Sequence, residues 1–346
     1  MSIELTYQDM KRKLSKVVPD VELVIKAELV EEINKLKQER NAVILGHNYM
    51  EPALYHTIPD FVGDSLYLSR QAAKTEKDVI VFCGVRFMAE TAKILNPTKT
   101  VLLPSMKAGC SLAASITAED VRQLKLRYPN VPVIAYVNTY ADVKAEVDVC
   151  CTSSNAVAVV QSFGTDTVIF LPDEYLARNV AKETGKHIIF PSLAGATDPA
   201  AENELDFQMV GWRGRCEVHE KFTVQDIRNI RAQFPDVLIL AHPECSPEVV
   251  AESDLTGSTS EMIKFVQKSN APQYLLLTEC SMGDNVAAAL PDKEMLRLCS
   301  VRCPHMNQIT LEDTLKSLQL MRYVIDVPDD ILLRAAKSVE RMVAIG

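Results

Sequence analysis

Three cysteines hold matching positions in this sequence, and cysteine thiolates are ligands for soft metals. Cys110, Cys216 and Cys303 each lie in a loop-like segment beside Gly, Arg or Pro, and each closes one copy of a repeated pattern. Structural zinc sites normally take four ligands, often as local CxxC pairs, whereas an iron–sulfur centre is bound by thiolates. A four-iron cluster on three cysteines leaves one iron open, and that iron could act as a Lewis acid that helps to expel water.

A second set of metal ligands stays open as an alternative. Cys299 and Cys303 are separated by three residues, and His305 follows, so these residues could form a local zinc site. The remaining cysteines are expected to be buried thiols (Cys83, Cys150 and Cys151) or to lie at strand ends, either packed or near a site (Cys245 and Cys280).

Polar side chains that could transfer protons follow three apolar runs. His47 and His242 hold matching places in two of the runs, and Asn138 holds that place in the third. Glu244 lies two residues beyond His242, where a carboxylate could act as a base beside an imidazole, and Tyr49 adds a hydroxyl donor. These residue types favour acid–base chemistry at the metal centre.

Hydroxyl residues begin the segments that come next. Ser65, Ser153 and Thr259 lie beside expected helix starts, where they could bind carboxylate or phosphate oxygens. The alternative role of each is a helix N-cap, which a hydroxyl in this position performs equally well. Tyr136 adds a further hydroxyl donor, and His219, three residues after the second cysteine, is expected to line the metal centre.

The elements that position these residues form three copies of one pattern, each roughly 90 to 105 residues long. The copies begin with the apolar runs at 42–49, 133–138 and 237–244. Strands that alternate with helices predict parallel sheets with helices on both faces, and ligands then bind beyond the carboxyl ends of the strands. We therefore expect an α/β protein with three pseudo-threefold-related αβα domains around a central active site.

Domain boundaries follow from the repeats. We expect a first domain at 1–108 that includes N-terminal helices, a second at 109–208 and a third at 209–303. Helices within 304–346 are expected to pack back on the first domain, and Thr310, with Asp313 three residues later, is expected to cap the first of them. Residues 193–208 break the pattern and are interpreted as an inserted loop or short helix.

Composition limits the classes of partner. The formal net charge is −9, which disfavours nucleic acid and anionic membranes as partners. No apolar run approaches the length of a membrane span, and the polar, acidic start is not typical of a signal peptide. We expect a cytoplasmic protein whose nine cysteines are reduced thiols or metal ligands.

The chain resembles the bacterial quinolinate synthase family over nearly its whole length. The resemblance rests on a set of short motifs that are specific together, although the three-residue pieces are weak alone. The motifs span residues 40–49, 63–66, 84–95, 108–112, 136–139, 144–147, 152–154, 242–244, 257–260 and 303–306.

This resemblance implies a 4Fe–4S cluster at the centre of three αβα domains. It also implies an activity, the condensation of iminosuccinate with dihydroxyacetone phosphate to quinolinate, with loss of phosphate and two waters, in de novo NAD biosynthesis. Transient contact with the L-aspartate oxidase that supplies iminosuccinate is a further expectation.

Positions that match the family's motifs receive its roles. Cys110, Cys216 and Cys303 match the metal ligands, and His47, Tyr49 and Glu244 match catalytic residues. The residues that match substrate contacts are His47, Ser65, Tyr136, Val137 (through its backbone), Asn138, Ser153, His242, Pro243, Glu244 and Thr259. Some relatives carry C-x-x-C-x-x-C at the last ligand, where this chain has Cys299-x-x-x-Cys303, which puts a local redox pair in doubt. The stretch before Cys216 is longer than in some relatives, so that assignment depends on the Gly-Arg-Cys-x-x-His219 context.

Two other functions remain as alternatives. One is a zinc- or iron-binding sensor of a dicarboxylate that performs no chemistry, and the other is a different hydro-lyase with the same cluster type. The pairing of Glu244 with Tyr49 speaks against a sensor, since a sensor needs no acid and base beside an open iron.

Overall fold

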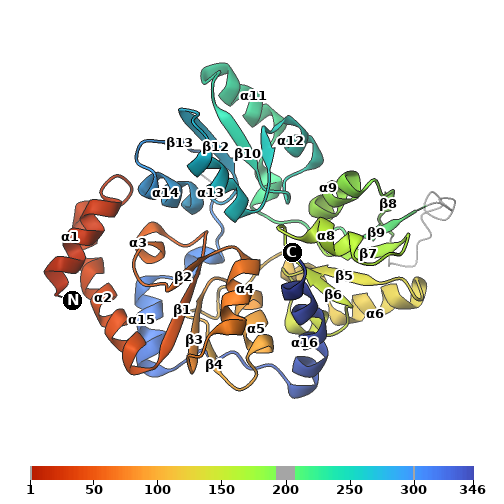
Figure 1. The fold of residues 1–346 in the computed structure, drawn as a ribbon, viewed down its shortest axis with the longest axis horizontal. Coiled ribbons are helices and arrows are strands. Elements are labelled where there is room, and N and C mark those ends of the chain that lie inside the picture. Colours follow the sequence, from red (N-terminus) through yellow and green to blue (C-terminus); the bar gives the residue numbers. More distant parts are fainter. Residues whose placement is uncertain (1, 192–206, 299–300) are drawn as a thin grey trace.

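The structure is a computed structural model that describes residues 2–191, 207–298 and 301–346. It confirms the predicted fold class, because three parallel sheets flanked by helices surround one centre (Figure 1). In each sheet the first strand in the sequence lies between the second and the third. The fourth strand pairs with the third in two of the sheets, and in the other sheet a fifth strand lies between them. Ligands of such sheets bind at the carboxyl ends of the strands, where the strand order reverses.

The first sheet has the order β2-β1-β3-β4, and every residue of β1 and β3 is buried. Continuous apolar runs are typical of parallel strands that helices cover on both faces. The strands are β1 (Ala42–His47), β2 (Phe61–Gly63), β3 (Val79–Cys83) and β4 (Thr100–Leu102), and the helices are α3 (Pro52–Tyr55), α4 (Ser65–Lys74) and α5 (Arg86–Leu95).

The second sheet has the order β6-β5-β7-β9-β8. Its strands are β5 (Val133–Tyr136), β6 (Val149–Cys151), β7 (Val168–Leu171), β8 (Ile188–Ile189) and β9 (Met209–Gly211). Its helices are η1 (Ala113–Ser115), α6 (Ala118–Arg127), α7 (Ala141–Lys144), α8 (Ala156–Gln161) and α9 (Glu174–Thr184). Strand β9 pairs with both β7 and β8, so this sheet extends past the boundary predicted at 208. The predicted insertion at 193–208 lies almost entirely outside the described residues.

The third sheet has the order β11-β10-β12-β13. Its strands are β10 (Leu238–Ala241), β11 (Leu255–Thr256), β12 (Gln273–Leu277) and β13 (Glu294–Leu296), and its helices are η2 (His219–Lys221), α11 (Val224–Gln233), α12 (Pro247–Glu252), α13 (Thr259–Lys268) and α14 (Cys280–Ala289). Neighbouring residues of β12 point to opposite faces, as the pleat of a strand requires. Leu275 joins the core on one face, and Tyr274 and Leu276 join the core on the other.

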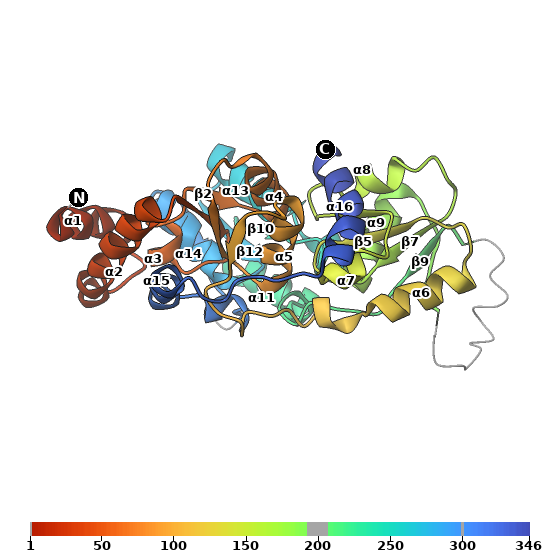
Figure 2. The ribbon, with the colours of Figure 1, turned by 90° about the horizontal axis from the view of Figure 1, so that it is seen from below.

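Helices at the two ends of the chain complete the fold. They are α1 (Ile3–Leu14), α2 (Asp20–Glu39), η3 (Met306–Gln308), α15 (Leu311–Leu320) and α16 (Asp329–Ala344). Helix α15 packs on α2 and β3, and α16 contacts α4, α5, α7 and β6, between the first and second sheets (Figure 2). Thr310 caps α15 by accepting a hydrogen bond from the Asp313 N–H, as its sequence predicts. Beyond these contacts, the predicted domain boundaries remain a proposal.

No membrane span is found among the described helices, none of which combines the required length with an apolar composition.

Candidate active site

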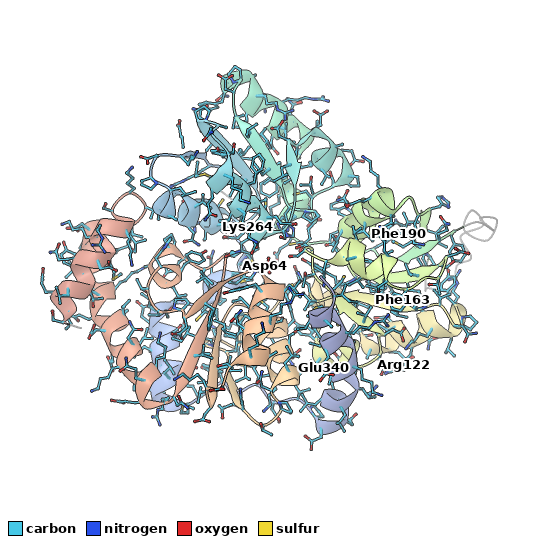
Figure 3. All side chains as sticks on the ribbon, in the orientation of Figure 1. Asp64, Arg122, Phe163, Phe190, Lys264 and Glu340 are labelled. Carbon is cyan, nitrogen blue, oxygen red and sulfur yellow. The ribbon has the colours of Figure 1, made fainter. Side chains whose placement is uncertain are left out.

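A central cavity collects residues from all three sheets. The cavity has a volume of about 70 Å³. Asp64, labelled near the centre of Figure 3, is on its wall. The predicted site residues that line it are His47, Tyr49, Ser65, Cys110, Tyr136, Asn138, Ser153, Cys216, His242, Glu244, Thr259 and Cys303. Val137 and Pro243 are buried but do not line the cavity.

The three predicted metal ligands come together in this cavity. Burial raises the pKa of the Cys110 thiol to about 12 and that of Cys303 to about 11, and it raises the pKa of Cys216 well above the ordinary thiol value. Thiols of this kind stay protonated until a metal takes the place of the protons. Three cysteine sulfurs reach one cavity from three separate loops. This donor set fits an iron–sulfur cluster, because such clusters are bound by thiolates.

The alternative zinc site stays a prediction, because Cys299 lies outside the described residues. His305 pairs with Glu217 at 3.1 Å. A different group could also hold one ion, because ligand atoms of Cys216, His219 and Glu244 all lie within 4.8 Å of one another. His219 Nδ1 already lies 2.9 Å from Glu244 Oε2 and 3.2 Å from Cys216 Sγ, and an ion between the three residues would replace these hydrogen bonds.

A buried chain of hydrogen bonds crosses the site between the first and third repeats. The Tyr49 hydroxyl lies 2.5 Å from Thr278 Oγ1, which lies 2.9 Å from His219 Nε2. On the other side of the ring, His219 Nδ1 lies 2.9 Å from Glu244 Oε2. Tyr136 donates to the second oxygen of Glu244 at 2.5 Å. The carboxylate and the Tyr49 phenol are therefore connected through one imidazole and one hydroxyl.

The two ends of this chain have opposite acid–base character. Burial alone would raise the pKa of Glu244, but the neighbouring His219 and His242 and the hydrogen bond from Tyr136 outweigh it and lower the pKa. Burial, followed by the charge of Glu244, raises the pKa of Tyr49 well above the ordinary phenol value. At neutral pH the site thus holds a charged carboxylate and a protonated phenol.

His47 and His242 have the same local geometry in their two repeats. Each Nδ1 accepts a hydrogen bond of 3.3 Å from the N–H two residues later, at Tyr49 and Glu244 respectively. Burial lowers the pKa of His47 to about 4 and that of His242 to about 3, so both rings are neutral at physiological pH. A ring whose Nδ1 accepts carries its proton on Nε2, which leaves each histidine an N–H donor for a ligand.

The hydroxyl residues at the helix starts line the cavity wall. Asp64 caps α4 by accepting from the Tyr67 N–H, and Ser258 caps α13. Ser65 and Thr259 are therefore the first helical residues and not the caps, which removes the alternative role for these two. No lysine or arginine is among the described residues of the wall, so hydroxyls, imidazoles and helix N–H groups are the donors for an anion.

Sequence reasoning missed Thr278, and it placed His219 only beside the metal. Thr278 directly follows β12, at the edge of the sheet where His242 and Glu244 follow β10. A polar residue at the end of a third buried strand was the available signal. The predicted buried thiols are fully buried, as is Cys245, whereas Cys280 is half-buried and contacts the Leu298 carbonyl at 3.2 Å.

Comparisons with known proteins agree with these observations. The family model described as "Quinolinate synthetase A protein" matches residues 31–344. The chain is 50% identical over 333 residues to "Quinolinate synthase 2" of Mesorhizobium japonicum, covering 96% of each chain. It is 50% identical to "Quinolinate synthase" of Agrobacterium fabrum, covering 96% of this chain and 90% of the relative. It is 46% identical over 345 residues to "Quinolinate synthase" of Caulobacter vibrioides, covering 99% and 88%.

Proposed function

The chain belongs to the quinolinate synthase family, and we propose from this that it condenses iminosuccinate with dihydroxyacetone phosphate to form quinolinate, phosphate and two waters. The observation that carries the proposal is a single cavity that holds three cysteines, a charged Glu244 and a protonated Tyr49. The reaction belongs to NAD biosynthesis and takes place in the cytoplasm. Iminosuccinate comes from L-aspartate oxidase, with which the protein makes transient contact.

Cys110, Cys216 and Cys303 hold a 4Fe–4S cluster in this proposal. When bound, the cluster supplies a Lewis acid at the iron that has no cysteine ligand. The support comes from the donor set, since three buried thiols reach one cavity from three repeats. A mononuclear ion on Cys216, His219 and Glu244 is the second candidate, because those ligand atoms are clustered.

Substrate anions bind at the helix starts. Ser65 and Thr259 lie at the N-termini of α4 and α13, where hydroxyl and N–H donors meet the positive end of the helix dipole. Ser153 lines the same wall, shortly before α8. Thr259 Oγ1 is oriented by a 2.9 Å hydrogen bond from Asn48. These donors suit the carboxylates of iminosuccinate and the phosphate of its co-substrate.

His47, His242, Tyr136 and Asn138 position the reacting groups. Both histidines offer an Nε2–H donor to substrate oxygens, as their accepting Nδ1 atoms require. Tyr136 donates to Glu244 and keeps its carboxylate in place. Val137 and Pro243 act through the backbone, because neither lines the cavity. The Val137 N–H donates to the Cys151 carbonyl at 2.7 Å. The Val137 carbonyl accepts from the Thr139 N–H at 2.8 Å and from Lys144 Nζ at 2.9 Å, and these bonds order the loop that carries Asn138.

Each dehydration removes a proton from carbon and a hydroxyl from the neighbouring atom. Glu244 takes the proton from carbon, and Tyr49 gives a proton to the departing hydroxyl, which leaves as water. Glu244 is then protonated and Tyr49 is deprotonated. The proton returns from Glu244 to Tyr49 through His219 and Thr278, which restores both groups for the second dehydration.

Anaerobic turnover tests the proposal. Iminosuccinate generated in place and dihydroxyacetone phosphate are added to iron-loaded protein, and the pyridine product and released phosphate are quantified. We expect one quinolinate for each phosphate. Iron-loaded protein that binds dicarboxylates but forms no pyridine would overturn the assignment and favour the sensor or the other hydro-lyase. Metal analysis with one ion in place of about four irons would favour the mononuclear site.

A further inference from the structure

The three cysteine loops are docked by the same backbone hydrogen bond. In every repeat, the first residue of the helix after the third strand donates its N–H to the carbonyl two residues before the cysteine. The bonds run from Arg86 to Ala108 (2.8 Å), from Glu174 to Gly214 (2.7 Å) and from Cys280 to Val301 (3.1 Å). The start of α5, α9 or α14 thus fixes the approach of one cysteine to the cavity.

Two of the loops carry an arginine directly before the cysteine. The side chain of each arginine binds the helix that already holds its loop through the backbone hydrogen bond. Arg215 contacts Glu174 Oε2 through Nε at 3.1 Å and through Nη2 at 3.0 Å. Arg302 donates to Ser281 Oγ at 3.1 Å and to Asp284 Oδ2 at 3.3 Å. The two residues before Cys216 and the two before Cys303 are therefore both bound to one helix. The first of the two is bound through its backbone carbonyl and the second, the arginine, through its side chain.

We propose that Arg215 and Arg302 are positioning residues that hold the sulfurs of Cys216 and Cys303 in the geometry the metal centre requires. This inference depends on the proposed function, since it assumes that these cysteines bind metal. On its C-terminal side each cysteine carbonyl accepts from the N–H four residues later, at 3.0 Å from Ala114 and Glu220 and 3.1 Å from Asn307. The arginine anchors the N-terminal side of the cysteine, so both sides must be fixed for the sulfur to keep its position. Residues that orient metal ligands from outside the ligand shell typically change metal affinity by ten- to a hundredfold.

Each carboxylate also binds a second arginine that provides a matched control. Glu174 Oε1 lies 2.9 Å from Arg178, one turn further along α9, and Asp284 lies 3.1 Å from Arg297. Arg178 and Arg297 are not adjacent to a cysteine. Arg178 is 38% exposed and Arg215 43% exposed, and Arg297 is 41% exposed and Arg302 46% exposed, so we expect the two replacements in each pair to change stability by similar amounts.

The experiment measures release of iron to a chelator from anaerobically loaded protein. We compare Arg215→Met and Arg302→Met with the controls Arg178→Met and Arg297→Met, and we follow thermal unfolding of the metal-free forms in parallel. The loop variants are expected to release iron roughly tenfold faster than the wild type. The control variants are expected to release iron at the wild-type rate, although all four unfold at similar temperatures.

Rescue and failure are distinguishable. Arg215→Lys keeps a cation opposite Glu174 and is expected to recover part of the retention, which a loss of general stability would not do. Equal release rates in the loop variants and the wild type would overturn the inference, as would equally fast release from the controls. Wild-type protein that binds no iron would refute the proposed metal centre itself.

Discussion

Replacement of Glu244 by glutamine is the sharpest test of the proposed chemistry. Glutamine has the same shape, and the site can accommodate it. Its amide oxygen can accept from the Tyr136 hydroxyl. Beside the carboxylate His219 carries its proton on Nδ1, and beside glutamine the proton moves to Nε2, so that Nδ1 can accept from the NH₂ group. The ring can then donate from Nε2 to Thr278 at 2.9 Å. Folding and iron content should therefore change little.

The expected loss is in turnover. A glutamine cannot take a proton from carbon, so it also has no proton to return to Tyr49 through His219 and Thr278. General acid–base catalysis contributes about a hundredfold or more, and a hundredfold corresponds to about 2.7 kcal/mol in the activation barrier. We expect Glu244→Gln to form quinolinate at least about a hundredfold more slowly while it binds a dicarboxylate normally.

The assay compares initial rates of pyridine formation under anaerobic conditions, normalised to bound iron. Glu248→Gln is the control, because Glu248 is an exposed carboxylate on the helix that follows the same loop. Turnover by Glu244→Gln within a fewfold of the wild type would refute the assignment of the base. Loss of iron in this variant alone would instead assign Glu244 to the metal, as the cluster of possible ligand atoms allows.

Four further changes test other parts of the structure. Tyr49→Phe removes only the hydroxyl 2.5 Å from Thr278, and product formation should fall about a hundredfold or more with iron content unchanged. Cys216→Ala should abolish iron loading, whereas Cys83→Ala, at a fully buried core position, should retain it; full iron in Cys216→Ala would contradict the three-ligand centre. Thr259→Ala should weaken dicarboxylate binding by about 1 kcal/mol, measured by titration, and loss of iron with normal affinity would indicate a structural role. Glu146 pairs with two arginines that lower its pKa against the effect of partial burial, so its contribution to stability is present above the unfolded pKa of about 4.3 and is lost as the pH falls through the lower folded value. Glu146→Gln should therefore lower the free energy of unfolding by about 1 kcal/mol at pH 7 and by progressively less as the pH falls below about 4.3, and a loss that does not change with pH would exclude the charge as the cause.

The amino-acid sequence by itself determined the repeating plan of the fold. Each apolar run long enough for one buried strand is followed by polar residues, and parallel strands bring such residues to one edge of a sheet. His47 and His242 could thus be assigned to one cavity from their places in two repeats. Local signals were equally reliable, as in Thr310 with Asp313 three residues later, because a helix cap depends only on neighbouring residues.

Only the tertiary structure decided which polar groups touch. Tyr49 and Thr278 are 229 positions apart in the chain, and their contact depends on how the first and third repeats dock, which no local pattern encodes. The same holds for β9, since β pairing is non-local and joins this strand to β7 and β8 of the second sheet, beyond the boundary predicted at 208. Periodicity and composition act along the chain, whereas hydrogen bonds between repeats form only after the cores have packed.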